Sequence, residues 1–205
     1  MPSIDDLRAG ITSAPVSTLL IVVNLAVFIA VRIDGRLMDV LALPPDWAGL
    51  LEQPWTVFTV FFTAEVLVHI AAAVLVIGIF GVRFERVAGS MHVLGVYLLA
   101  GLAGSLALVA TAVATGFAEP SNGPSAAFFG LVGALAACPR ETWGAKLHVE
   151  KVVAVVVLAQ LAPAVGIGDW VSSAAHLAGI GVGAAYGYLV RPTIANRQRP
   201  ASLDA

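Results

Sequence analysis

Three side chains that could take part in a reaction stand in or beside apolar stretches of this 205-residue sequence: Ser125, His69 and His176. A serine hydroxyl is a weak nucleophile and needs an adjacent base, for which histidine is the commonest side chain. Histidines inside membrane-spanning segments are costly, so each is a candidate functional residue if these stretches cross a membrane. Ser125 and His176 together are the smallest set that could carry out acyl transfer.

The spacing of small residues indicates how these side chains could meet. Ser125, Phe129 and Gly133 recur every four residues and share one face of a helix. In the last apolar stretch one face carries a histidine and three glycines: His176, Gly179, Gly183 and Gly187. Small residues at this spacing let membrane helices approach closely, which could bring His176 within hydrogen-bond reach of Ser125. Spacing alone leaves a second interpretation open, in which Ser125 is a helix N-cap and His176 a packing residue.

The composition defines the environment of these residues. Hydrophobic residues make up 59% of the chain and charged residues 12%, whereas soluble domains have about 25% charged residues. A soluble domain of this length could not bury so much apolar surface, and a disordered chain would be polar and highly charged. A net charge of -2 and glycines without a fixed period exclude nucleic-acid-binding and collagen-like chains. An all-α, polytopic membrane protein in contact with the lipid bilayer remains.

Six apolar segments, separated by polar or Gly/Pro-rich breaks, match six crossings of roughly 20 residues each. They are residues 15–31, 66–82, 93–117, 125–138, 152–167 and 171–190. We expect a six-helix membrane domain over residues 15–192, between a short tail of residues 1–14 and a polar, disordered tail of residues 193–205. No cleavable signal peptide is expected, because the first apolar run is long enough to remain as a span.

The distribution of basic residues predicts the orientation in the membrane. With the N-terminus in the cytoplasm, nine Lys and Arg residues lie on that side, and only Arg32 and Arg36 lie outside. We therefore expect both termini to be cytoplasmic and the membrane to be the cell membrane. The first outer loop, residues 33–65, is rich in aromatic residues, which favour the membrane interface. It is expected to be partly embedded and amphipathic, with a small extramembrane cap as the alternative.

The fourth apolar segment is too short to cross the membrane. Its 14 residues, 125–138, would extend about 21 Å, whereas the hydrocarbon core is roughly 30 Å thick. Because Arg140 and Lys146 mark the cytoplasmic surface, the helix must begin below the outer surface. Irregular backbone at that depth is tolerated only inside the protein or along a water-filled cavity. Ser125 is therefore expected to face a cavity in the outer third of the membrane, together with His69 and His176.

Two separated segments resemble the rhomboid family of intramembrane serine proteases. GPSAAFFG, which begins at Gly123, is similar to the family's GxSG-xxFG segment. AHLAG, which begins at Ala175 and is followed by Gly183, is similar to its AHxxGxxxG segment. The resemblance extends over residues 16–192. It implies six spans, an outward-facing cavity, substrates that are membrane-spanning helices, and no metal or organic cofactor; it does not decide the oligomeric state.

The resemblance also implies a role for each matching residue. Ser125 corresponds to the nucleophile and His176 to the general base. His69 and the backbone N–H of Ser125 correspond to oxyanion donors. Supporting positions, which shape the turn, pack on the histidine or bring the helices together, are Gly123, Phe129, Gly179 and Gly183.

The sequence departs from the family pattern at three positions. Ala73 replaces the Asn of HxxxN, Ala126 replaces the second Gly of GxSG, and Ala64 replaces an upstream histidine. Loss of one oxyanion donor typically lowers turnover by about 10²–10³-fold. Two functions therefore follow: a serine endopeptidase that cuts transmembrane helices near the outer boundary, or a rhomboid-like pseudoprotease that binds such helices without cutting them. A transporter or channel has little support, because no chain of buried charges crosses the spans.

Overall fold

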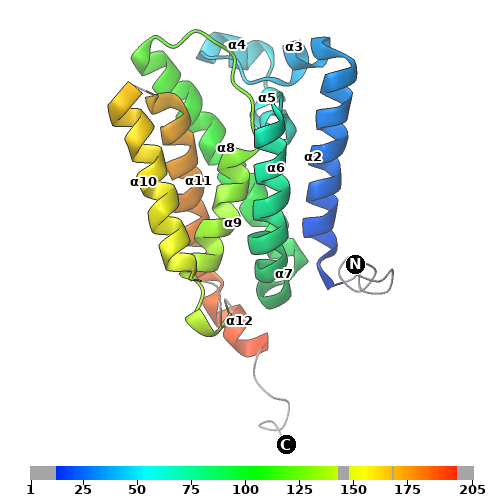
Figure 1. The fold of residues 1–205 in the computed structure, drawn as a ribbon, viewed down its shortest axis with the longest axis vertical. Helices are drawn as coiled ribbons and strands as arrows, with labels where there is room; N and C mark the ends of the chain where they lie inside the picture. The colour runs from blue at the N-terminus through cyan, green and yellow to red at the C-terminus, as the bar shows by residue number, and fades with distance from the viewer. Residues whose placement is uncertain (1–12, 143–147, 168, 198–205) are drawn as a thin grey trace, which may run out of the picture.

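The computed structural model describes residues 13–142, 148–167 and 169–197, and within them the regular elements are helices. Figure 1 shows the long helices running side by side as one bundle. They are α2 (Pro15–Ile33), α6 (Leu67–Val76), α8 (Ser90–Thr115), α9 (Ser125–Ala137), α10 (Val149–Ile167) and α11 (Trp170–Leu189). The predicted all-α fold is confirmed, and the helix bounds lie close to the predicted segments.

Three of the described helical stretches are long and apolar enough to cross a membrane: Pro15–Ile33, Leu67–Ala88 and Ser90–Thr115. The second of these is continuous from α6 through a π-helical turn, η3 (Ile77–Gly81), into α7 (Val82–Ala88). The helix α9, with 13 residues, is shorter than these three stretches. It ends at Ala137 because Cys138 adopts the extended backbone that a following proline favours.

The short α9 lies at the centre of the bundle and packs against α8 and α11. In Figure 1 it begins well below the upper ends of α2 and α8, and the chain descends to it from the top as an irregular segment. This is the arrangement that the shortness of the fourth apolar segment predicts. The start of α9 is therefore enclosed by other helices.

Glycines allow α11 to approach α9 at backbone distance. A Cβ atom on any of three glycines would collide with a carbonyl oxygen of α9: Gly179 faces Ala126, Gly183 faces Gly130, and Gly187 faces Ala134. The predicted close approach of the last helix to the fourth segment is confirmed. This contact determines how near a side chain on α11 can come to the start of α9.

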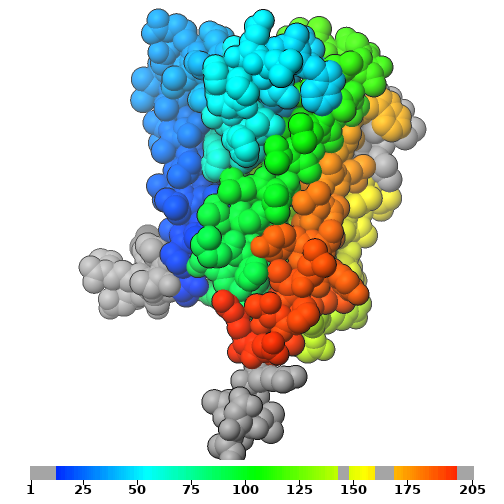
Figure 2. Space-filling view, turned by 180° about the vertical axis from the view of Figure 1, so that it is seen from behind, coloured from blue at the N-terminus to red at the C-terminus, as the bar shows by residue number. Residues whose placement is uncertain are grey.

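The connection between α2 and α6 folds into short helices at the upper end of the bundle (Figure 2, blue to cyan). They are η1 (Gly35–Leu37), α3 (Met38–Leu41), α4 (Trp47–Glu52), α5 (Thr56–Thr59) and η2 (Val60–Phe62). Phe61 is 1% exposed, whereas Trp47 and Trp55 are each 46% exposed, so the segment has an inner and an outer face as expected. Its backbone forms an antiparallel bridge between Leu43 and Ser121, four residues before Ser125.

The lower end of the bundle is held by a buried carboxylate. Glu85 accepts the backbone N–H groups of Val16 and Ser17 at 2.9 and 2.7 Å, and the hydroxyl of Ser90 at 2.7 Å. A carboxylate at a helix N-terminus satisfies N–H groups that have no partner within the helix. Glu85 thereby joins the first turns of α2 and α8 to α7.

The C-terminal segment differs from the expectation. Residues 193–197 belong to a helix, α12 (Arg191–Arg197), so the prediction of disorder from residue 193 is wrong up to residue 197. The physical reason is Ile194, whose side chain is completely buried against the bundle and anchors an otherwise polar helix. The rest of that predicted tail lies outside the described residues.

Candidate active site

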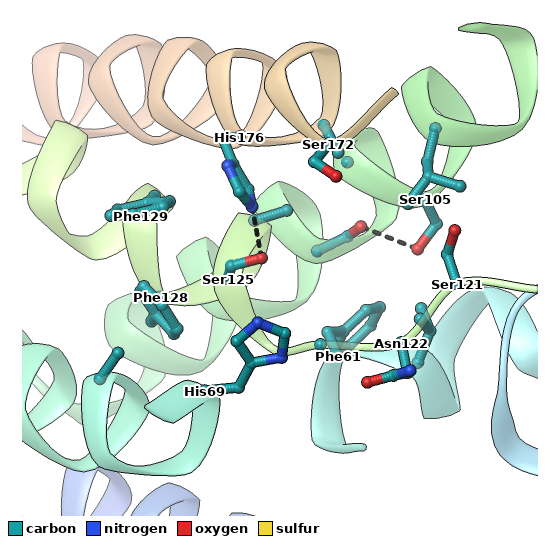
Figure 3. A pocket seen from close by; sticks show the side chains of 18 of the residues that line it. Phe61, His69, Ser105, Ser121, Asn122, Ser125, Phe128, Phe129, Ser172 and His176 are labelled. Atoms are coloured by element: carbon teal, nitrogen blue, oxygen red, sulfur yellow. Dashed lines mark hydrogen bonds between the residues drawn. The ribbon is translucent and has the colours of Figure 1, made fainter. Parts of the chain in front are cut away.

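A cavity of about 320 Å³ opens at the start of α9. Its walls come from α6, α8, α9, α11 and two connecting segments. Figure 3 shows Ser125 near its centre, with His176 on one side and His69 on the other. The lining residues are Val60, Phe61, Val68, His69, Ala72, Gly101, Gly104, Ser105, Leu108, Ser121, Asn122, Gly123, Ser125, Ala126, Phe128, Phe129, Ser172, Ala175 and His176.

Ser125 and His176 are in direct contact. The distance between His176 Nε2 and Ser125 Oγ is 2.6 Å, within hydrogen-bond range, although the two residues are 51 positions apart in sequence. The N-cap of α9 is Pro124, and no side chain caps this helix. The structure therefore excludes the interpretation that Ser125 is an N-cap, and leaves its hydroxyl facing a potential base.

The turn before Ser125 depends on a glycine. Gly123 has φ +138°, a conformation that side chains with a Cβ rarely adopt. Its N–H donates to the carbonyl of Val60 at 3.3 Å. Pro124 follows and starts the helix, whose first backbone bond of its own runs from Phe128 N–H to the Pro124 carbonyl at 3.0 Å. The sequence GPS thus turns the chain so that Ser125 is the first residue of a buried helix.

The start of α9 also supplies hydrogen-bond donors. The N–H groups of Ser125 and Ala126 precede the first intrahelical bond, as at any helix N-terminus. His69, from α6, faces Ser125 across the cavity (Figure 3). An ideal Cβ on Gly123 would lie 3.7 Å from Ser125 Oγ and 3.9 Å from His69 Nδ1, so glycine leaves open space between these two groups. An oxyanion formed next to Ser125 could occupy that space.

Phe129 packs against the imidazole ring of His176. Its ring centroid is 5.1 Å from that of His176, and the two planes meet at 72°, an edge-to-face contact. Phe129 lies one helical turn after Ser125, so the same face of α9 presents the hydroxyl and the aromatic ring. The contact agrees with the position that the resemblance implies for Phe129.

The structure explains how two of the departures from the family pattern are accommodated. Ala126 has no positive φ, so its methyl group causes no backbone strain. That methyl group packs against Gly104 of α8, where a Cβ would collide with it. Ala73 is completely buried and is not among the residues that line the cavity, whereas its neighbour Ala72 is. The cavity therefore has no side-chain amide from position 73.

Several cavity residues were not found from the sequence. Ser105 and Ser172 come from α8 and α11, Phe61 comes from η2, and Ser121 and Asn122 come from the irregular segment before α9. The only available signal was spacing on α8, where Gly101 and Ser105 share a helical face. The irregular segments have no periodicity, so no pattern could indicate which of their residues face inward.

The titratable side chains that line the cavity are His69 and His176, and of its lining hydroxyl groups that of Ser125 is in contact with His176. The described lining residues of the cavity include no Asp or Glu. Within the described part of the chain, no group of three or more His, Cys, Asp and Glu side chains is placed to hold a metal ion. A serine–histidine pair beside unpaired N–H groups is suited to acyl transfer.

Comparison with known proteins gives two findings. The family model described as Rhomboid domain matches residues 51–193, more than two thirds of the chain. The chain is also similar to RHOMBOID-like protein 6, mitochondrial, of Arabidopsis thaliana, with 25% identity over 152 residues. The matched region covers 71% of this chain and 47% of that relative, so the chain spans about half the relative's length.

Proposed function

This chain belongs to the rhomboid family, and from that membership we propose that it is an intramembrane serine endopeptidase acting through Ser125 and His176. The observation that carries the proposal is the 2.6 Å contact between Ser125 Oγ and His176 Nε2 inside a cavity. A serine hydroxyl becomes an effective nucleophile when a base at this distance can remove its proton. Its substrates are transmembrane helices, which it cuts near the outward-facing boundary of the membrane.

The proposed reaction has two acyl-transfer steps. Ser125 Oγ attacks the peptide carbonyl carbon while His176 Nε2 takes the hydroxyl proton, and the histidine then protonates the leaving amine. Water next attacks the acyl-enzyme, again with His176 as base, and Ser125 is regenerated. The oxyanion of each tetrahedral intermediate accepts the Ser125 N–H and a bond from His69. No metal or organic cofactor takes part.

Proteolysis inside a membrane requires water and polar partners for an unwound substrate backbone, and the cavity can supply both. Its volume of about 320 Å³ is enough for several waters, since one water occupies about 30 Å³ in the liquid. A substrate helix hides its peptide bonds by internal hydrogen bonding, so it must unwind locally before Ser125 can reach a carbonyl. Polar groups along the cavity wall, such as Ser105 and Ser172, offer partners for the backbone groups that are exposed.

We propose that residues 15–192 form a six-span domain whose flanking segments, 1–14 and 193–205, are cytoplasmic, with the cell membrane as its location. The described basic residues support this orientation. Six of them belong to segments at the lower end in Figure 1, whereas Arg32 belongs to the last turn of α2 and Arg36 to η1, both at the upper end. The lower group consists of Arg83, Arg86, Arg140, Lys151, Arg191 and Arg197.

Reporter fusions test this orientation. We expect a fusion at Ala205 to report the cytoplasm and a fusion inserted beside Asn122 to report the opposite side, because of the bias in basic residues. Paired reporters, one active only outside and one only inside, give the readout for each site. An external signal at Ala205 would reverse the orientation and would move the cut to the cytoplasmic side.

A fluorophosphonate probe tests the proposed nucleophile without knowledge of the substrate. We expect the purified wild-type protein to gain the mass of one probe adduct on Ser125, because only an activated serine reacts readily. Ser125→Ala should not react. Thr115→Ala, which removes an exposed hydroxyl bonded within α8, should react as the wild type does. Labelling of Ser125→Ala would assign the nucleophile elsewhere.

One observation favours a second function, a pseudoprotease that binds membrane helices without cutting them. Position 73 contributes no amide to the cavity. The proposed hydrogen-bond donors to the oxyanion are therefore His69 and the backbone N–H groups at the start of α9. A weaker oxyanion site slows the reaction by about tenfold for every 1.4 kcal/mol of transition-state stabilisation that is lost. Absence of both labelling and cleavage in the wild type would favour this function.

A further inference from the structure

We propose that Tyr97 is a positioning residue for the nucleophile, acting through the segment of residues 57–61. This inference rests on the proposed function, because it concerns the same reaction. Tyr97 does not touch the serine or the histidine. Its hydroxyl holds a backbone segment that in turn holds the turn before Ser125.

The first step is a contact between one face of α8 and this segment. Tyr97, Gly101 and Ser105 follow one another every four residues on α8. Tyr97 donates its hydroxyl proton to the Phe61 carbonyl at 2.7 Å. The Ser105 hydroxyl lies 3.0 Å from the Val57 carbonyl and 3.0 Å from the Gly101 carbonyl of its own helix, and shares its proton between them. Between Tyr97 and Ser105, a Cβ on Gly101 would lie 2.6 Å from the Phe61 ring, so this ring occupies the space that glycine leaves.

The Tyr97 hydroxyl is fixed from both sides. Tyr97 and Asn24 are completely buried, and Asn24 Nδ2 donates to the tyrosine oxygen at 3.0 Å. The same amide group donates to the Leu20 carbonyl at 2.8 Å, which orients it within α2. The hydroxyl therefore accepts from α2 and donates to Phe61, and such a chain of bonds is stronger in a low-dielectric interior.

The second step leads from the segment to the nucleophile. Val60, adjacent to Phe61, accepts the N–H of Gly123 at 3.3 Å with its carbonyl oxygen. Gly123 is the residue with φ +138°, two positions before Ser125. Phe61 itself lines the cavity. Movement of the Phe61 carbonyl toward a new partner would thus disturb both the cavity wall and the acceptor of the Gly123 N–H, which is one of the bonds that hold this turn beside the Leu43–Ser121 bridge.

A second tyrosine provides a matched control. The Tyr186 hydroxyl also makes one side-chain hydrogen bond, to His92 Nδ1 at 3.1 Å, between α8 and α11. Tyr186 lies ten residues beyond His176, about 15 Å along the helix, and does not line the cavity. Tyr97→Phe and Tyr186→Phe therefore each remove a hydroxyl and an interhelical bond, but only the first is connected to Gly123.

The experiment compares these two variants in detergent or liposomes. We expect Tyr97→Phe to lower kcat by about ten- to a hundredfold with KM nearly unchanged, because small displacements of a reacting group cost up to about 10²-fold. Hydrogen exchange by mass spectrometry should show faster exchange of the Gly123 amide. Tyr186→Phe should change neither quantity. Asn24→Ala should have a smaller effect in the same direction, and adding it to Tyr97→Phe should cost little more.

The outcomes separate this inference from the proposed function. Equal kcat and equal Gly123 exchange in Tyr97→Phe and Tyr186→Phe would overturn the inference even if the wild type is an active protease. Faster Gly123 exchange in Tyr97→Phe alone would support the positioning role even if no substrate is cut, and the protease proposal would then fail by itself. A rise in KM with kcat unchanged would assign Tyr97 to substrate binding and would also overturn the inference.

Discussion

Ser125→Ala and His176→Ala are each expected to abolish cleavage of a single-pass membrane substrate, by roughly 10⁴–10⁶-fold in kcat. The first change removes the proposed nucleophile and the second removes the proposed base, which lies 2.6 Å from it. Because the two groups act as a unit, the double variant should be no worse than either single variant. The assay uses purified protein in liposomes with a substrate whose helix is destabilised near its outer end, and identifies the products by mass.

His92→Ala is the matched control for the histidine change. His92 also contacts a hydroxyl on a neighbouring helix, that of Tyr186, but lies outside the cavity. We expect this variant to retain activity, and all variants to fold, because none opens a large cavity. Cleavage that persists in Ser125→Ala would rule out Ser125 as the nucleophile. Loss of activity in His92→Ala equal to that in His176→Ala would indicate a general effect on the fold.

Gly183→Val is expected to have the second largest effect, a loss of about 10²-fold or more in kcat together with lower stability. A Cβ at this position would collide with the carbonyl of Gly130, which is backbone and cannot rotate away. The helices α9 and α11 must then separate, and a displacement of about 1 Å between Ser125 and His176 is enough for such a loss in rate. Overpacking of this kind typically costs about 1–3 kcal/mol of folding free energy.

Gly181→Val is the control on the same helix. An added Cβ at Gly181 meets no atom within 4 Å, so this variant changes the intrinsic helix propensity by the same amount without a collision. We expect it to remain active and as stable as the wild type within about 1 kcal/mol. The measurements are kcat and thermal unfolding in detergent. Equal behaviour of the two variants would contradict the importance of the close contact between α9 and α11.

Local composition and periodicity were sufficient for much of the architecture. The apolar segments predicted the helices because a chain in lipid must satisfy its backbone hydrogen bonds internally. The length of residues 125–138 predicted that α9 begins inside the bundle. The glycine spacing after His176 predicted the close approach to α9, because contact at backbone distance requires residues without side chains. Each of these inferences uses only the length, composition or residue spacing of a single segment.

Whether Ser125 and His176 meet was decided only by the tertiary structure. Sequence spacing shows which residues share a helical face, but the rotation of α11 about its axis depends on packing against both α8 and α9. The same spacing was compatible with a capping serine and a packing histidine. The 2.6 Å contact arises because Gly179 and Gly183 bring two helices together that are 51 residues apart at this point.

Contacts between distant segments account for the remaining features that the sequence did not predict. The bond from Tyr97 to the Phe61 carbonyl, the fit of Ala126 against Gly104 and the anchoring of α12 by Ile194 all involve residues from different elements. The segment between α2 and α6 has no repeating pattern, so its inward residues follow from the space left by the helices beneath it. The sequence by itself determined the helices and the candidate reactive residues. The tertiary structure decided their mutual positions, because these depend on side-chain packing across the bundle.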